Sequence, residues 1–233
     1  MLLPLLLNNK DVKNMQKIKT YIINYNRLIW PLNMANYLAQ LSDLEVIFID
    51  NASTYEPLLE WYNRQTTFEV IKMTQNYGHN VFWSQNLINQ VSDYYIVTDP
   101  DLDLSDIPLN FLDILKEGLS KYPSRCKCGF GLEIYDFPKD KTPYQDYIVN
   151  IEKNYWSGDF DGLYYYNSAI DTTFALYHKS RYNNLTAVRT SRPYVARHLP
   201  WYFTKDNLTD EDINYIKTAA GSCSAKRQME LFL

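Results

Sequence analysis

The sequence predicts a single α/β domain with a mostly parallel central sheet and helices on both faces. Short apolar segments alternate with helix-like segments through the first half of the chain. Strands that are apolar throughout are typical of parallel sheets buried on both faces. The length of 233 residues suits one large domain better than two. Hydrophobic residues make up 46% of the chain, which is ordinary globular usage and sufficient for a core.

The expected elements of the first half follow a regular order. Ile and Tyr dominate residues 18–24 and predict a strand, and in the next segment Met34 and Leu38 fall on one face of a helix that begins near Pro31. The remaining expected elements are a strand over 45–49, a helix over 57–63, a strand over 68–73, a helix over 81–91 and a strand over 94–98.

The second half is less regular. Ser105 is expected to cap a helix that runs to Tyr122, and residues 129–135 predict a strand. Further elements are an amphipathic segment over 147–156, a loop over 157–162 and a strand over 172–177. Thr209 to Asp212 has the pattern of a capping box and predicts the start of a last helix.

Charge and composition exclude several classes of function. Lys and Arg number 23 and Asp and Glu 27, a net charge of −4, so the chain lacks the basic footprint of a nucleic-acid binder and no nucleic-acid partner is expected. The apolar residues 1–7 are too short to cross a bilayer, so no transmembrane segment is expected. The three cysteines lack zinc-site spacing and are interpreted as free thiols, which favours a reducing, cytoplasmic location.

Polar residues follow the expected strands at the point where each one ends. Asn24, Asp50, Asn76 and Asp99 each come directly after an expected strand or within a few residues of it. Ligands of open α/β sheets bind beyond the carboxyl ends of the strands. We therefore expect these side chains to converge on one rim.

An acidic segment after residues 94–98 is the sharpest feature of the sequence. Asp99, Asp101 and Asp103 alternate, so an extended chain would point their carboxylates the same way and create a site for a hard cation. An EF-hand calcium loop is excluded, because its sixth and twelfth positions hold Leu104 and Asn110 in place of Gly and Glu. A solvated turn is the remaining alternative.

The order of these motifs resembles the nucleotide-binding half of GT-A glycosyltransferases, closest to the family 2-like group. The resemblance rests on residues 24–27, 49–54, 76–78 and 99–101, and covers about residues 18–104. Further stretches up to Tyr202 resemble a narrower group of bacterial or viral glycosyltransferases. The resemblance implies one GT-A domain over residues 1–233, with a nucleotide-sugar half over about 18–104 and an acceptor half with a C-terminal helix over about 125–233.

The resemblance also implies ligands and roles. The donor would be a nucleotide-diphosphate sugar, with a UDP-sugar favoured, and the acceptor a glycan or other hydroxyl compound. Asp50 would lie near the uracil or ribose, and Asp99 and Asp101 would hold Mn²⁺ or Mg²⁺ against the diphosphate. Asp103 is an alternative metal ligand to Asp99. His198 is the candidate for a late third ligand, against the alternative of a histidine packed beside Trp201.

The remaining candidate residues divide between donor binding and catalysis. Those expected near the donor, besides Asp50 and Asp99, are Asn24, Asn76, Gly78 and Arg197. Those expected as the catalytic base for the acceptor hydroxyl are Asp171 first, then Glu133 and Asp136. The loop carboxylates Asp159 and Asp161 are candidates to close over the donor.

Two other classes of function stay open at this point. A nucleotidyltransferase also uses acidic strand ends, but residues 24–28 lack the glycine-rich loop that such an enzyme needs. A catalytically inactive sugar- or nucleotide-binding module would keep Asp50 and the tyrosines and bind no metal. The sequence does not separate this module from an active transferase.

Overall fold

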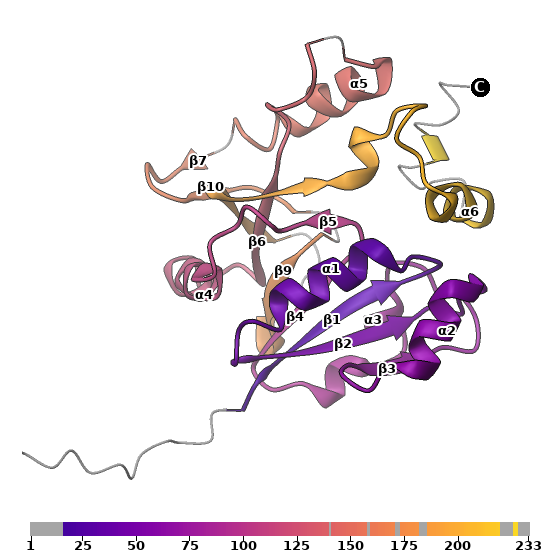
Figure 1. Cartoon of the computed structure of the whole chain (residues 1–233). Helices are drawn as coiled ribbons and strands as arrows, with labels where there is room; N and C mark the ends of the chain where they lie inside the picture. Colours follow the sequence, from indigo (N-terminus) through magenta and orange to yellow (C-terminus); the bar gives the residue numbers. More distant parts are fainter. Residues whose placement is uncertain are drawn as a thin grey trace, which may run out of the picture.

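The computed structural model describes residues 16–139, 141–157, 159–170, 173–181, 186–219 and 226–227. These residues form one large mixed sheet with helices on both sides (Figure 1). The strand order is β3 (Glu69–Lys72), β2 (Leu44–Asp50), β1 (Ile18–Asn24), β4 (Tyr94–Thr98), β9 (Ala175–His178), β6 (Lys127–Leu132), β10 (Ala187–His198), β8 (Tyr165–Asn167) and β7 (Asp159–Phe160), and β5 (Leu102–Asp103) pairs with β10 off this path.

The core of the sheet is parallel, as the sequence predicts. Strands β1, β2, β3 and β4 run in one direction, and β6 and β10 are parallel to each other. Strand β9 is inserted between β4 and β6 and is antiparallel to both. It therefore joins the parallel strands β3, β2, β1 and β4 to the strands β6, β10, β8 and β7.

Strands β1, β2 and β4 are largely apolar because both of their faces are buried, whereas the edge strand β3 is partly exposed. Ile22, Phe48 and Ile96 belong to the core that also contains α1 (Ile29–Leu38). Their neighbours in sequence, such as Tyr21 and Val97, belong to a second core with α3 (Val81–Ser84). Since successive strand side chains point to opposite faces, an apolar run fills both cores.

The helices between β1 and β4 follow the expectation with one correction. Helices α1 and α2 (Glu56–Arg64) lie where the sequence predicts them. The expected helix over 81–91 is wrong: α3 ends at Ser84, Asn86 has a positive φ of 57°, and a 3₁₀ helix η1 (Leu87–Gln90) follows. A left-handed residue interrupts the ladder of helical hydrogen bonds.

The helix expected from Ser105 begins later, as α4 (Phe111–Lys121). The backbone amide of Ser105 donates to Asp103 Oδ1 at 2.9 Å, so Ser105 lies in a turn and is not a helix cap. Pro108 also disfavours helical backbone at the preceding residue, Ile107. The acidic segment is therefore followed by an irregular connection before α4.

The acceptor half contains more regular structure than its sequence predicts. Helix α5 (Pro143–Glu152) begins earlier than expected, and β7 lies inside the expected loop over 157–162. Short 3₁₀ helices η2 (Lys179–Arg181) and η3 (Leu199–Tyr202) follow β9 and β10. Helix α6 (Asp210–Thr218) has the expected capping box of Thr209 and Asp212. Among the helices that the structure describes, none has the length and apolarity to cross a bilayer.

Helix α6 is fixed to the loop after β1 by a buried ion pair. The guanidinium of Arg27 pairs with Asp212, and both side chains are almost completely buried. The same guanidinium lies 4.2 Å from the ring centroid of Trp30 and 3.9 Å from that of Tyr215. Glu211 accepts the backbone amide of Ile29, at the start of α1, whose own N-cap makes no side-chain hydrogen bond. The C-terminal helix thus packs against the segment between β1 and α1.

Removing the Arg27 guanidinium should strongly destabilise the protein, because it leaves Asp212 as a buried, uncompensated charge. We expect Arg27→Ala to lower the free energy of unfolding by about 3–5 kcal/mol, measured by urea denaturation. The matched control is Arg64→Ala, since Arg64 pairs with Glu60 at the surface and both side chains are exposed. Equal effects of the two substitutions would contradict this account of α6.

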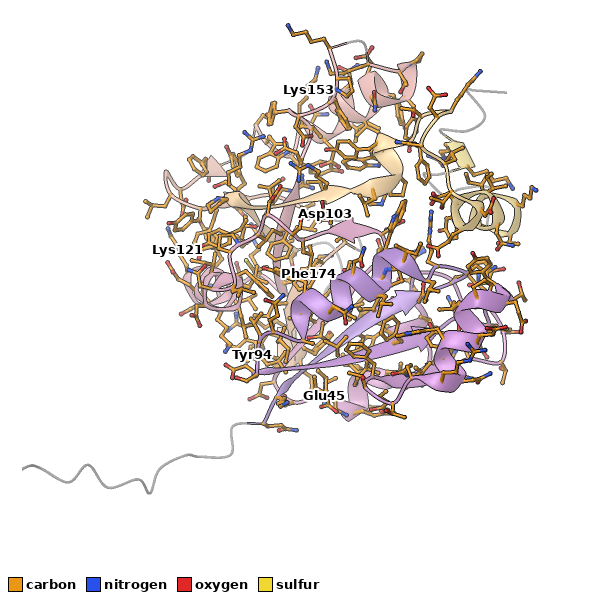
Figure 2. All side chains as sticks on the ribbon, viewed as in Figure 1. Glu45, Tyr94, Asp103, Lys121, Lys153 and Phe174 are labelled. Atoms are coloured by element: carbon orange, nitrogen blue, oxygen red, sulfur yellow. The ribbon has the colours of Figure 1, made fainter. Side chains whose placement is uncertain are left out.

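Asp161 fixes the turn between β7 and β8. Its Oδ1 accepts the amides of Leu163, Tyr164 and Tyr165 at 2.9 to 3.0 Å. Its Oδ2 accepts from Lys121 Nζ at 2.5 Å, at the end of α4 (Figure 2). Asp161 therefore holds a turn against α4 in the geometry described, and its closure over the donor stays a prediction.

The pKa of Asp161 gives a pH dependence with a defined sign. Burial alone would raise the pKa, but the hydrogen bonds from Lys121 and the amides outweigh it and lower the pKa from 3.8 to about 2. A depressed pKa in the folded state stabilises the protein above the unfolded value and ceases to do so as the pH falls from about 4 to about 2. We expect Asp161→Asn to remove this part of the acid dependence in unfolding curves measured across that range. An unchanged acid profile would contradict the assignment.

Candidate functional site

The carboxyl ends of β1, β2 and β4 lie side by side and form the predicted rim. Asn24 pairs in register with Asp50, and Ile22 with Thr98, which directly precedes Asp99. Asp50 is 3% exposed, and its Oδ1 accepts the amide of Ser53 at 3.2 Å. The structure therefore brings the ends of these strands together as expected.

Asn24 lies inside the protein rather than on the surface of the rim. It is completely buried, and its Nδ2 donates to the carbonyl of Arg27 at 2.7 Å and to the hydroxyl of Tyr62 at 2.9 Å. These bonds fix the turn after β1. In the geometry described, Asn24 shapes the rim, and its role toward a donor stays a prediction.

Two further asparagines, which sequence reasoning missed, connect the loops of the rim. Asn26 has a φ of 51°, and its Oδ1 accepts the amides of Thr54 and Tyr55 at 2.6 and 3.0 Å. Asn51 accepts the amide of Tyr77 at 2.9 Å and donates to the carbonyl of Gly78 at 3.0 Å. Asparagine is a residue type that tolerates left-handed backbone, which was the available signal for Asn26.

The loop with Asn76 and Gly78 is a tight turn at this rim. Asn76 Oδ1 accepts the amide of Gly78 at 2.8 Å, and Gly78 has a φ of 73°. A residue with a Cβ would be strained there. Because Asn51 binds this turn from β2, both predicted residues lie beside the end of that strand.

The acidic strand end meets the late histidine. Strand β5 pairs antiparallel with the end of β10, so that Arg197 lies opposite Asp103 and His198 opposite Leu102. The amide of Leu199 donates to the carbonyl of Asp101 at 2.9 Å. His198 Nε2 lies 3.6 Å from Asp101 Oδ1. The structure thus brings together the two residues that the sequence analysis singled out from opposite halves of the chain.

The pair of Asp101 and His198 fits a divalent cation in its chemistry. Asp101 Oδ1 is buried, and no hydrogen bond to it is found from any residue in the described ranges. Carboxylate and imidazole groups both bind Mn²⁺, and Mg²⁺ often takes one or two carboxylates together with substrate phosphates. Within the described ranges, no three His, Cys, Asp or Glu side chains group closely enough to hold a metal ion by themselves. His198 also packs against Trp201, with ring centroids 4.8 Å apart.

Arg197 stands among carboxylates beside this pair. Its Nε donates to Asp136 and its Nη1 to Asp106, each at 2.6 Å, and Asp103 lies 3.9 Å away. Figure 2 shows Asp103 on β5, between β10 and α1. The hydrogen bonds to Asp106 and Asp136 raise the pKa of Arg197, which stays charged. In this geometry its guanidinium donates to the carboxylates of Asp106 and Asp136, and its contact with a donor diphosphate stays a prediction.

The candidate bases differ in the exposure of their side chains, which is 9% for Glu133 and 31% for Asp136. Glu133 Oε1 accepts the amides of Ile134 and Tyr135 at 3.0 and 2.7 Å, and Oε2 accepts from Arg192 at 3.0 and 2.5 Å. Both oxygens are therefore engaged, and Glu133 holds the chain where it leaves β6.

Asp136 keeps a partly exposed carboxylate near the rim. Its Oδ1 accepts from the hydroxyl of Tyr202 at 2.6 Å and its Oδ2 from Arg197. Burial, followed by the hydrogen bond to Asp136, raises the pKa of Tyr202, so this phenol remains a donor. Asp171, the first choice from the sequence, lies outside the described residues.

Comparison with known proteins supports the fold. No protein-family model matches the chain, and no curated protein matches its sequence. Among solved structures, the mannosyltransferase PcManGT from Pyrobaculum calidifontis, in complex with GDP-Man and Mn²⁺, has a TM-score of 0.50 at 11% identity, over 93% of this chain and 68% of that one. S. aureus TarS 1-349 has a TM-score of 0.49 at 13% identity, over 79% of this chain.

The chain spans 61% of the length of that TarS fragment. The structure of TarS 1-349 in complex with UDP has a TM-score of 0.47 at 12% identity, over 89% of this chain and 73% of that one. At these identities the likeness concerns the fold alone. The chain has a GT-A-like glycosyltransferase fold, and the fold class expected from its sequence is confirmed.

Glu133 should stabilise the folded state, because its carboxylate accepts two backbone amides and the Arg192 guanidinium. We expect Glu133→Ala to lower the free energy of unfolding by about 1–3 kcal/mol, because two amides and the Arg192 guanidinium lose their acceptor. The control is Glu117→Ala on the exposed face of α4. Urea denaturation compares the two, and a Glu133 variant as stable as the control would contradict the assignment.

Proposed function

We propose that this protein is a metal-dependent glycosyltransferase that moves a sugar from a nucleotide-diphosphate donor, a UDP-sugar, to a hydroxyl acceptor. The observation that carries the proposal is the buried Asp101 Oδ1, 3.6 Å from His198 Nε2, in the short segment between the parallel strand β4 and strand β5. Open α/β sheets bind their ligands beyond the carboxyl ends of their parallel strands. The complex of PcManGT with GDP-Man and Mn²⁺ supports a nucleotide-sugar donor and a divalent cation for this fold.

The metal-binding residues in this proposal are Asp101 and His198, with Asp99 or Asp103 as a further ligand. Mn²⁺ or Mg²⁺, when bound, would supply a Lewis acid for the charge that develops on the leaving diphosphate. Asp101 Oδ1 can bind the cation without giving up a hydrogen bond, because it accepts none from the described residues. The same oxygen is buried and has the imidazole of His198 at 3.6 Å, an arrangement that a bound cation would stabilise.

The donor-binding residues in this proposal are those of the rim. Asp50 would receive the uracil or ribose, and the turn of Asn76 and Gly78 would lie beside it. The hydrogen bonds of Asn26 and Asn51 hold the rim loops in place before any ligand arrives. Such preorganisation reduces the cost of ordering loops on binding.

The base in this proposal is Asp136, whose side chain is more exposed than that of Glu133, and Asp171, the first choice from the sequence, stays the alternative. Tyr202 and Arg197 fix the direction of the Asp136 carboxylate. In this proposal the carboxylate takes the proton of the acceptor hydroxyl. At the same time the hydroxyl oxygen bonds to the anomeric carbon of the sugar, and the bond from that carbon to the nucleoside diphosphate breaks. This role requires an inverting course.

A thermal-shift experiment tests the donor and the metal together. We expect UDP with MnCl₂ to raise the unfolding midpoint, since a ligand at a hundred times its Kd stabilises the native state by about 2.7 kcal/mol. Asp101→Asn and His198→Ala should lose most of this response. Asp206→Asn, at an exposed aspartate in the turn before α6, is the matched control and should respond like the wild type.

Each other outcome of this experiment has a definite meaning. A response to GDP or CMP in place of UDP would change the donor base and keep the metal site. A nucleotide response that is independent of Mn²⁺ would favour the inactive binding module. The absence of a response to every nucleotide would contradict the proposed function.

A further inference from the structure

Four aromatic side chains form a connected and partly exposed row on the acceptor half. The members of this aromatic row, in order, are Tyr135, Trp156, Tyr166 and Phe160. Successive ring centroids lie 6.3, 5.3 and 4.5 Å apart. Tyr135 is 65% exposed and Phe160 44% exposed. Large aromatic residues exposed together, rather than singly, are typical of binding surfaces.

The middle of the row is held rigidly. Trp156 Nε1 donates to the carbonyl of Leu132 at 3.2 Å. Gly131 makes room for the indole, since a Cβ there would lie 2.4 Å from it. The buried Arg189 lies beside the indole: its Nη1 is 2.6 Å from Glu152 Oε2, and its guanidinium carbon is 5.8 Å from the Trp156 ring centroid. The ring is fixed before a ligand arrives, which lowers the entropic cost of binding.

The row is continuous with the candidate active site. Tyr135 lies next in sequence to Asp136, the proposed base, and its amide binds Glu133. The guanidinium of Arg192 lies 5.7 Å from the Tyr135 ring centroid, and this side chain is 61% exposed. At the other end, Asp159 is exposed beside Phe160. Ring faces with charged hydrogen-bonding groups at both ends suit an amphipathic ligand better than a purely apolar one.

We propose that the aromatic row is the platform that binds a glycan acceptor, with pyranose C–H faces on the rings and hydroxyls toward Arg192 and Asp159. This inference rests on the proposed function, since it assigns the substrate class of the same site. A glycan longer than one residue would extend along Trp156 and Tyr166 toward Phe160, in the β7–β8 hairpin (Figure 1).

A printed glycan microarray tests the platform without donor or turnover. We expect the wild type to retain a subset of pyranose glycans, and Tyr135→Ala and Phe160→Ala each to reduce that retention about tenfold, the loss of one stacking contact. Tyr147→Ala is the matched control, because Tyr147 is 49% exposed on α5 and is not a member of the row. Its retention should equal that of the wild type. Unfolding midpoints of all variants confirm that they fold.

The outcomes separate the platform from the proposed function. Retention of no glycan by the wild type, or equal retention by the row variants, would overturn the platform, even if UDP and Mn²⁺ stabilise the protein. Row-dependent retention without any nucleotide response would keep the platform and contradict the transferase. Size-exclusion chromatography tests a third outcome. If the row variants lose self-association and keep their glycan retention, the row is a protein interface and the proposal is overturned.

Discussion

The antiparallel pairing of β5 with the end of β10 is the interaction on which the candidate site depends. Strand β10 runs parallel to β6 in the acceptor half and then reaches β5, which follows the acidic end of β4. His198 is the last residue of β10 and Asp101 directly precedes β5, so this pairing, together with the hydrogen bond from the Leu199 amide to the Asp101 carbonyl, sets the distance between the two side chains. Sites built on strands hold their geometry more tightly than sites built on loops.

Buried arginines fix the elements around the pairing. Arg27 joins α6 to the loop after β1, and Arg189 joins β10 to the end of α5 through Glu152. Such pairs are weak evidence for net stability, because desolvation offsets much of the Coulomb attraction. Their specific geometry instead selects one arrangement of helices around the rim. The guanidinium of Arg27 also lies 4.2 Å from the Trp30 ring centroid, and that of Arg189 lies 5.8 Å from the Trp156 ring centroid in the aromatic row.

The donor half could be predicted closely from the sequence, and the acceptor half could not. Residues 18–24 and 94–98 are strands with the expected bounds, because burial on both faces leaves a continuous apolar run. Strand β10 was missed, since Arg189, Thr190, Ser191, Arg192 and Pro193 interrupt any apolar pattern. Partners distant in sequence, including Glu152 and Glu133, make these polar residues compatible with a sheet. The approach of His198 to Asp101 followed from resemblance, whereas the roles of Asn26 and Asn51 depend on tertiary contacts that no spacing reveals.

The central claim is that Asp101 and His198 bind a divalent cation together with a nucleoside diphosphate. Electron paramagnetic resonance of Mn²⁺ tests it directly, because the signal of the free hexaaqua ion falls when the ion is bound. The account predicts that the protein and UDP together remove more of the free Mn²⁺ signal than the sum of their separate effects, and that Asp101→Asn abolishes the excess. A signal equal to that sum in the wild type would contradict the account.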